Sequence, residues 1–139
     1  MRKIDKIIIH CTATPEGREV TKRDLWNWHV EERGWSNIGY HYFIDLKGNV
    51  HKCRPESIKG AHTRGQNGSS IGIAYAGGLD ENFKTKDTRN ADQKEALECL
   101  LYELKGKYKN AIIYGHRDYS SKDCPSFDAF NEYYYISSL

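Results

Sequence analysis

The sequence predicts an α/β domain with a central mixed β-sheet flanked by about three helices. Short apolar stretches rich in β-branched residues recur along the chain, and segments with a helical period of about 3.6 residues separate them. A hairpin predicted among these strands makes the sheet mixed, because hairpin strands are antiparallel. The length of 139 residues suits one hydrophobic core. We therefore expect residues 1–139 to form a single domain.

The first element is a short strand over residues 6–11, which leads into a loop at residues 12–15. His10 lies at the C-terminal end of this strand, where sites are often built in α/β sheets. A histidine at such a position is more often structural than a metal ligand. The position by itself therefore leaves both roles open.

A helix over about residues 22–33 follows this loop. Thr21 and Asp24 resemble a capping box at its start, and Trp28 and His29 fall on its apolar side. We interpret His29 as a packed and hydrogen-bonded core histidine.

A β-hairpin and a long loop make up the middle of the chain. Residues 40–45 and 50–53 read as two strands joined by a turn, and residues 71–75 read as a central strand. Residues 54–70 between them lack periodicity, and loops of this length in compact domains are usually functional or disordered. Because this loop leads directly into a central strand, we favour a functional role.

The second half of the chain contains the clearest helical pattern, over about residues 91–108, after a polar loop at residues 80–89. A short apolar strand at residues 111–114 leads to His116. After Pro125, Ser126 is expected to cap a last helix that runs to about residue 134.

Charge and hydropathy exclude several classes of protein. The net charge is +2 without a dense block of Lys or Arg, so we do not expect a nucleic-acid partner. No apolar run approaches the ~20 residues that cross a bilayer, so we expect no membrane insertion. The N-terminal apolar run covers only residues 7–9, whereas a signal peptide needs about 7–15 apolar residues. We expect synthesis in the cytoplasm without a signal peptide.

The segment GHRDYSSKDCPSF, residues 115–127, carries the residues best suited to chemistry. His116 and Cys124 offer an imidazole and a thiolate, which zinc prefers, and the four cysteines of the chain lack any C-x-x-C spacing. If the strands that end at His10 and His116 are parallel neighbours, both histidines emerge at one edge of the sheet. The spacing of His116 and Cys124 is not a recognised metal motif, and the segment could equally be an ordinary loop with a free thiol.

Several motifs in one order resemble a known family. They are IIIHCTAT, WHVEERGWSNIGYHYFID, GAHTRGQN, SSIGIAYAGG, GHRD and KDCPSFD. Together they cover nearly the whole chain, and in order and spacing they are similar to the zinc-dependent type-2 N-acetylmuramoyl-L-alanine amidases. This family includes the amidase-type lysozymes of bacteriophages and the peptidoglycan recognition proteins.

The resemblance implies one zinc ion held by His10, His116 and Cys124, with Tyr40 and Lys122 at catalytic positions. The implied reaction is hydrolysis of the amide bond between N-acetylmuramic acid and L-alanine in peptidoglycan. In that reaction a lysine would stabilise the oxyanion and a tyrosine hydroxyl would donate a hydrogen bond to the same oxygen or hold the attacking water.

The resemblance also places His62 and Asn67 at substrate-binding positions in the long loop, and Arg64 in the same loop is a further substrate-binding candidate. Arg64 is a candidate partner for a carboxylate of the stem peptide. We expect a monomer whose partner is peptidoglycan. Because no signal peptide is expected, the enzyme would reach the cell wall through a holin-like pore or after lysis, as a phage or prophage endolysin does.

Two alternatives remain at this point. The first is a peptidoglycan-binding module without catalytic activity, which the complete set of expected ligands disfavours. The second is a Cys-His hydrolase with Cys124 as nucleophile, which the following Pro125 disfavours because no helix begins directly after the cysteine.

Overall fold

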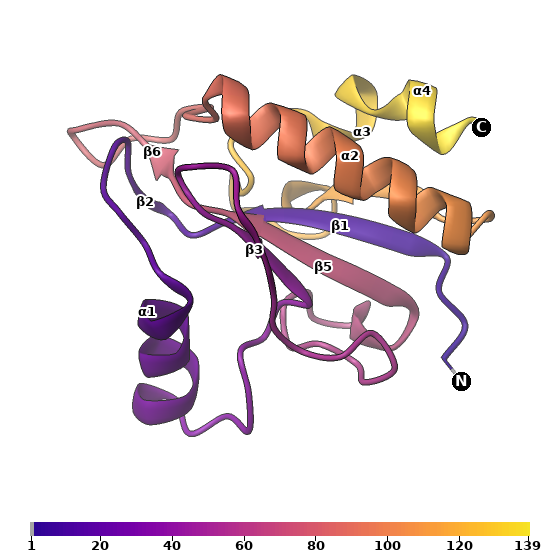
Figure 1. The fold of residues 1–139 in the computed structure, drawn as a ribbon, viewed down its shortest axis with the longest axis horizontal. Helices are drawn as coiled ribbons and strands as arrows, with labels where there is room; N and C mark the ends of the chain where they lie inside the picture. The colour runs from indigo at the N-terminus through magenta and orange to yellow at the C-terminus, as the bar shows by residue number, and fades with distance from the viewer. Residues whose placement is uncertain (1) are drawn as a thin grey trace.

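The computed structural model describes residues 2–139 and contains, within them, a five-stranded sheet and a separate two-stranded sheet. The main sheet has the order β4-β3-β5-β1-β7, formed by β1 (Lys6–Cys11), β3 (Tyr42–Ile44), β4 (Val50–Lys52), β5 (Ser70–Tyr75) and β7 (Ile112–Gly115). β1 is parallel to β5 and β7, and β3 is parallel to β5 but antiparallel to β4. The predicted mixed sheet is therefore confirmed (Figure 1).

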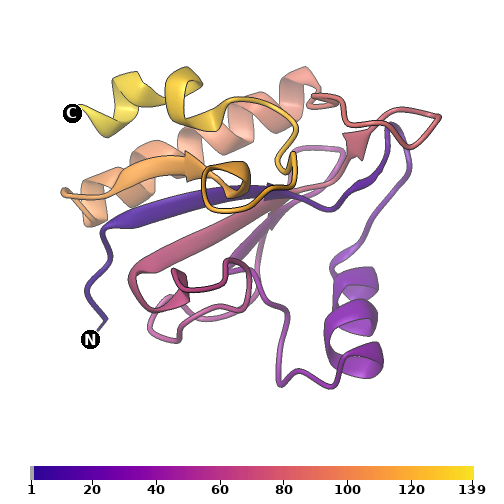
Figure 2. The same cartoon turned by 180° about the vertical axis from the view of Figure 1, so that it is seen from behind.

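Three helical regions flank the sheet within the described part of the chain. One face is covered by α2 (Ala91–Lys107), α3 (Ala129–Glu132) and α4 (Tyr134–Ser137), and the other side carries α1 (Lys22–Trp26) with the π-helical turn η1 (Asn27–Glu32) (Figures 1 and 2). The remaining elements are β2 (Thr14–Pro15), β6 (Gly78–Leu79), η2 (Asn67–Ser69) and η3 (His116–Asp118). Among residues 2–139, no helix combines the length and apolar composition that a membrane span requires.

Strand β1 separates two hydrophobic cores, because successive side chains of a strand point to opposite faces. Ile9 and Cys11 pack in the core beneath α2, whereas Leu25 and Phe43 belong to the core on the side of α1. Each fully buried isoleucine contributes about 1.5–3 kcal/mol to the stability of the fold. His10 lies between Ile9 and Cys11, so its side chain points to the face on which the candidate site is built.

The start of α1 confirms the predicted capping box. The Thr21 hydroxyl accepts a hydrogen bond from the Asp24 amide at 3.0 Å, and the Asp24 carboxylate accepts one from the Thr21 amide at 2.9 Å. The helix continues as far as Glu32, and its last turns widen into η1.

The prediction for the last helix was wrong in its start. Asp128, and not Ser126, is the N-cap, and its side chain accepts a hydrogen bond from the Asn131 amide at 3.2 Å. Ser126 has a φ of +73°, and its hydroxyl donates to the Gly78 carbonyl at 2.8 Å. The chain is still turning at Ser126 to reach β6, so a helix cannot begin there. The helix also breaks near Tyr133, which divides it into α3 and α4.

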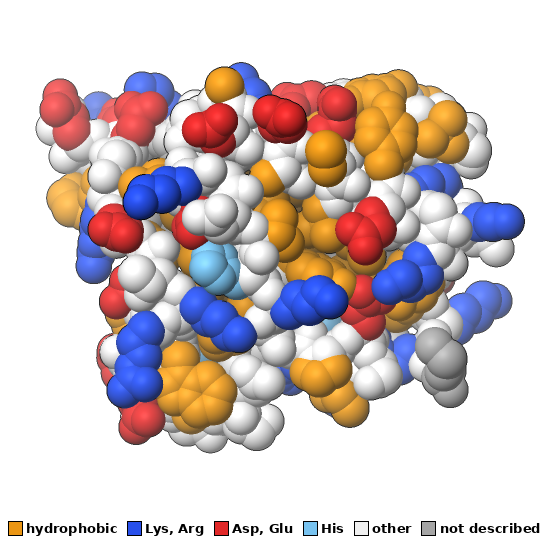
Figure 3. Space-filling model, viewed as in Figure 1, with side chains coloured by type: hydrophobic (Ala, Val, Ile, Leu, Met, Phe, Trp, Pro, Cys, Tyr) orange, Lys and Arg blue, Asp and Glu red, His pale blue; other side chains and the backbone are white. Residues whose placement is uncertain are grey.

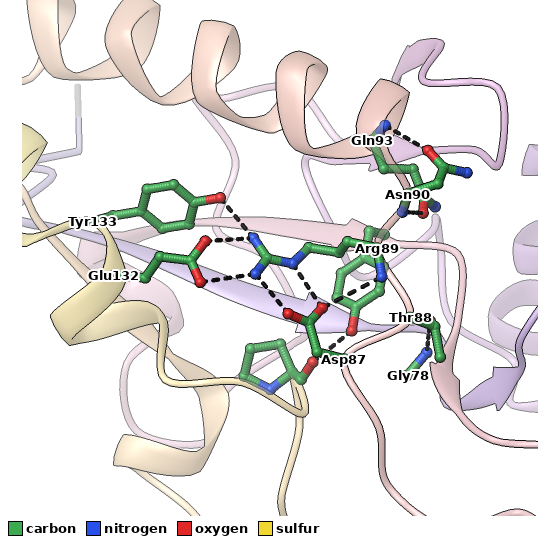
Figure 4. Close-up of polar contacts among 10 residues, drawn as sticks. Gly78, Asp87, Thr88, Arg89, Asn90, Gln93, Glu132 and Tyr133 are labelled. Atoms are coloured by element: carbon green, nitrogen blue, oxygen red, sulfur yellow. Dashed lines mark hydrogen bonds and ion pairs between the residues drawn. The ribbon is translucent and has the colours of Figure 1, made fainter.

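A buried arginine ties the loop before α2 to the C-terminal helices (Figure 4). The Arg89 side chain is only 1% exposed and forms ion pairs with Asp87 at 2.9 Å and Glu132 at 2.8 Å. It also donates to the Tyr133 hydroxyl at 2.7 Å and lies 3.4 Å from the centre of the Phe127 ring. These contacts anchor the segment that follows Cys124.

Candidate metal centre

Two parallel strands bring His10 and His116 together. In the register of β1 and β7, Ile9 lies opposite Gly115. The next residue on each chain segment is a histidine, His10 after Ile9 and His116 after Gly115. The centres of the two imidazole rings lie 4.6 Å apart, and the His10 side chain is buried. This pairing is the arrangement that the sequence predicted for two parallel neighbours.

The segment after β7 returns to the same edge of the sheet and delivers Cys124. Figure 2 shows this orange segment passing over the end of β1. The Arg117 amide donates to the Cys124 carbonyl at 2.6 Å, which closes the loop, and the Cys11 amide lies 3.2 Å from the Cys124 sulfur. That sulfur lies 3.9 Å from Nδ1 of His10. Ligand atoms of His10, His116 and Cys124 all lie within 4.8 Å of one another.

These three donors fit a zinc ion. One thiolate and two imidazoles are a common zinc donor set, and bond lengths of about 2.0–2.3 Å require donor separations slightly shorter than those in the site. Burial, together with nearby His62 and His116, holds the pKa of His10 well below its usual value. Burial and the positive charge of Lys122 also lower the pKa of His116. Both rings are therefore neutral near pH 7, as metal ligands must be.

The Cys124 thiol has the opposite tendency. A hydrogen bond with the Cys11 thiol, together with burial, raises the pKa of Cys124 above its usual value. Without a metal the sulfur is therefore protonated at neutral pH. Metal binding must displace this proton, so metal affinity falls as the pH falls.

The two predicted catalytic residues, Tyr40 and Lys122, relate to this cluster in different ways. The Tyr40 ring is 5.2 Å from the His10 ring, and burial raises the pKa of its hydroxyl, which keeps the proton and can donate a hydrogen bond. Lys122 is exposed, two residues before Cys124, and its charge acts on both His116 and Cys124. The structure thus places the Tyr40 ring against a candidate ligand and puts the charge of Lys122 within electrostatic reach of two, while the catalytic roles of both remain predictions.

The three predicted substrate-binding residues have different positions. His62 Nδ1 lies 2.9 Å from His10 Nε2, and burial lowers the pKa of His62 to about 3. The Asn67 side-chain oxygen accepts hydrogen bonds from the backbone amides of His62 at 3.0 Å and Thr63 at 2.9 Å. Arg64 is exposed. Of the three, only His62 contacts a candidate ligand, His10. A role in substrate binding stays a prediction for all three.

His29 is a structural histidine, as predicted. Its Nδ1 accepts a hydrogen bond from the Gly39 amide at 2.9 Å, and burial lowers its pKa to about 4. The contact between His62 and His10 was not predicted, because the two residues are 52 positions apart and no periodicity links the loop to the strand.

A polar pocket adjoins the candidate centre. It has a volume of about 280 Å³ and is lined by Thr12 after β1, by residues of α1 and η1 with the following Arg33, and by Tyr40 before β3. None of the three candidate ligands lines this pocket, and none lines a larger hollow of about 500 Å³. The larger hollow is lined by Arg2, Tyr42, Lys52, Arg54, Glu56 and Lys107, among others. Figure 3, in the same view as Figure 1, shows Lys and Arg side chains in a band across this face of the protein. The smaller pocket is linked to the donors through Tyr40, which lines it and whose ring lies 5.2 Å from the His10 ring.

Comparisons with known proteins identify the family of the chain. Residues 1–127 match the family described as N-acetylmuramoyl-L-alanine amidase. The endolysin of Escherichia phage T7 is 38% identical over 124 residues, covering 89% of this chain and 82% of the endolysin. The endolysin of Enterobacteria phage K11 is 35% identical and covers 91% and 83%. Peptidoglycan-recognition protein SC2 of Drosophila simulans is 32% identical and covers 90% and 70%.

Solved structures show the same fold. N-acetylmuramoyl-L-alanine amidase LysC from Clostridium intestinale URNW superposes with a TM-score of 0.80 at 29% identity, covering 99% of this chain and 85% of that one. The ectodomain complex of peptidoglycan recognition proteins LCa and LCx, bound to tracheal cytotoxin, gives 0.78 at 30% identity, covering 96% and 82%. On the match over residues 1–127 and these relatives, the chain belongs to the N-acetylmuramoyl-L-alanine amidase family.

Proposed function

We propose that this protein is a zinc-dependent amidase that cleaves the bond between N-acetylmuramic acid and L-alanine in peptidoglycan. The observation that carries the proposal is the convergence of His10, His116 and Cys124 within 4.8 Å of one another at one edge of the sheet. Family membership and the phage endolysins among the relatives support peptidoglycan as the substrate. We further propose that residues 1–139 act as one monomeric domain that reaches the cell wall after release from the cell.

The side chains around the three donors suit amide hydrolysis. Zinc, when bound, supplies Lewis-acid chemistry that polarises an amide carbonyl and makes water a stronger acid. The Tyr40 hydroxyl stays protonated, so it can donate to the carbonyl oxygen or orient water, and it cannot act as a base at neutral pH. The exposed ammonium of Lys122 would stabilise the negative charge that develops on the same oxygen.

The substrate would approach along the polar pocket that Tyr40 lines. We propose that Arg64, exposed in the loop, pairs with a carboxylate of the stem peptide. Asn67 can still offer its amide nitrogen while its oxygen holds the loop, and His62 lies at the inner end of the loop beside His10.

The relation to peptidoglycan recognition proteins favours one other function, binding of peptidoglycan fragments without cleavage. The complete donor set with Tyr40 and Lys122 favours the enzyme. The raised pKa of Cys124 argues against the other alternative, a thiolate nucleophile, because the sulfur is protonated in the absence of a metal.

Digestion of purified sacculi, followed by mass analysis, distinguishes these functions. We expect free stem peptides that begin with L-alanine, and release of glycan fragments instead would refute the proposal. Cys124→Ser is expected to lose zinc and activity together. Tyr40→Phe and Lys122→Ala are expected to keep one zinc per chain and lose most turnover. Binding without any product would favour the recognition module.

A further inference from the structure

The two ring nitrogens of His10 face different partners. Nδ1 lies on the side of Cys124, 3.9 Å from its sulfur, whereas Nε2 lies 2.9 Å from Nδ1 of His62 and 3.2 Å from the hydroxyl of Thr63. The proposed metal role of His10 therefore uses one nitrogen, and the other is already engaged in the protein interior.

The hydrogen bonds around His62 form a chain in which each donor meets an acceptor. If His10 Nδ1 is free to bind a metal, its proton sits on Nε2 and must be donated to His62 Nδ1 or to Thr63. His62 then carries its own proton on Nε2, which faces the Ser70 hydroxyl at 3.4 Å. Ser70 in turn donates to the carbonyl of Gln66 at 2.8 Å. The tautomers follow from this network because it leaves no nitrogen without a suitable partner.

The position of the His62 ring is built into the fold. A Cβ atom added at Gly60 or at Gly72 would come within 2.5 Å of Cδ2 of His62. Gly72 lies inside strand β5, where glycine is unfavourable because it adds no side-chain packing. The Asn67 side chain also holds the backbone of His62 and Thr63. The absence of side chains at Gly60 and Gly72 makes room for the His62 ring, and Asn67 fixes the backbone that carries it next to His10.

We infer that His62 is a positioning residue: together with Thr63 and Ser70, it holds the His10 ring in the tautomer and orientation that turn Nδ1 toward Cys124 and His116. This inference rests on the proposed zinc site. It assigns His62 a role that a substrate contact does not require, because the partner of the ring is a candidate ligand on the neighbouring strand. Outer partners of metal-bound histidines commonly change metal affinity about 10–100-fold when they are removed.

Zinc affinity, measured by competition with a chromophoric chelator, tests the inference. The double variant His62→Leu/Thr63→Val removes both acceptors for His10 Nε2, and we expect zinc to bind about 10–100-fold more weakly. His62→Asn places an oxygen near the former Nδ1 position and should restore most of the affinity. His51→Leu is the matched control. His51 lies on β4 and pairs with Asp45 at 2.8 Å, away from His10, so this variant should bind zinc as tightly as the wild type.

A second measurement does not depend on zinc. Nitrogen-15 NMR of the metal-free protein should show His10 protonated on Nε2 in the wild type and in His62→Asn, and a mixture of tautomers in the double variant. If the double variant does not fold in urea-unfolding controls, His62→Leu alone replaces it, with a smaller expected loss because Thr63 remains at 3.2 Å.

The outcomes separate this inference from the proposed function. Equal zinc affinity and an unchanged His10 tautomer in the folded His62 variants would overturn the positioning role while leaving the zinc site intact. Failure of the wild type to bind zinc would overturn the proposed function, and NMR would then still report whether His62 sets the His10 tautomer.

Discussion

Replacing Arg89 with leucine should destabilise the protein strongly, because this side chain joins three parts of the fold. Its guanidinium pairs with Asp87 at 2.9 Å and with Glu132 at 2.8 Å, and its own side chain is 1% exposed. It donates to the Tyr133 hydroxyl at 2.7 Å and lies over the Phe127 ring (Figure 4). Arg89→Leu keeps an apolar side chain over the ring but leaves two carboxylates and one hydroxyl without their partner.

The expected cost follows from the burial of these partners. Removing one member of a buried ion pair costs about 3–5 kcal/mol when the remaining charge stays buried. The side chains of Asp87 and Glu132 are 32% and 43% exposed, so water can hydrate them again after the substitution. We therefore expect a loss near the lower limit, about 3 kcal/mol, which is roughly a hundredfold change in the unfolding equilibrium.

Equilibrium unfolding in urea measures this loss, and Arg117→Leu is the control. Arg117 pairs with Asp128 at 3.9 Å with both side chains more than one-third exposed, so its removal should cost less than about 1 kcal/mol. An Arg89→Leu protein within 1 kcal/mol of the wild type would refute the reasoning. It would mean that the desolvation of the guanidinium cancels its contacts.

Three further predictions concern pH, packing and metal removal. His41 is fully buried, and burial lowers its pKa to about 4, so the unfolded chain binds a proton between about pH 6.5 and 4 that the folded protein does not. The free energy of unfolding should therefore decrease by up to about 3 kcal/mol as the pH falls through this window, and urea unfolding of His41→Gln should show a weaker pH dependence. Gly72→Ala places a Cβ 2.5 Å from the His62 ring and should cost about 1–3 kcal/mol in urea unfolding, whereas Gly68→Ala, with no atom within 4 Å, should be close to neutral on packing grounds. A chelator should abolish release of stem peptides from sacculi and added zinc should restore it, and activity that persists in metal-free enzyme would exclude the metal mechanism.

Some parts of the fold could be predicted because their signals are local. The capping box of Thr21 and Asp24 involves residues three positions apart, and the helical period of α2 lies within one continuous segment. The last helix shows where local signals fail. A serine after Pro125 resembles a helix cap, but the contact of Ser126 with Gly78 delays the helix until Asp128. A bond between residues 48 positions apart overrides the local preference.

The sequence by itself determined the class of fold, the family resemblance, and the identity of His10, His116 and Cys124 as candidate ligands. These inferences rest on periodicity within short segments and on motifs whose order can be read directly. Only the tertiary structure decided which nitrogen of His10 faces Cys124 and that His62 lies behind the ring. The physical reason is that parallel pairing of β1, β5 and β7 brings together side chains from distant segments, and the orientation of a ring depends on all of its neighbours at once.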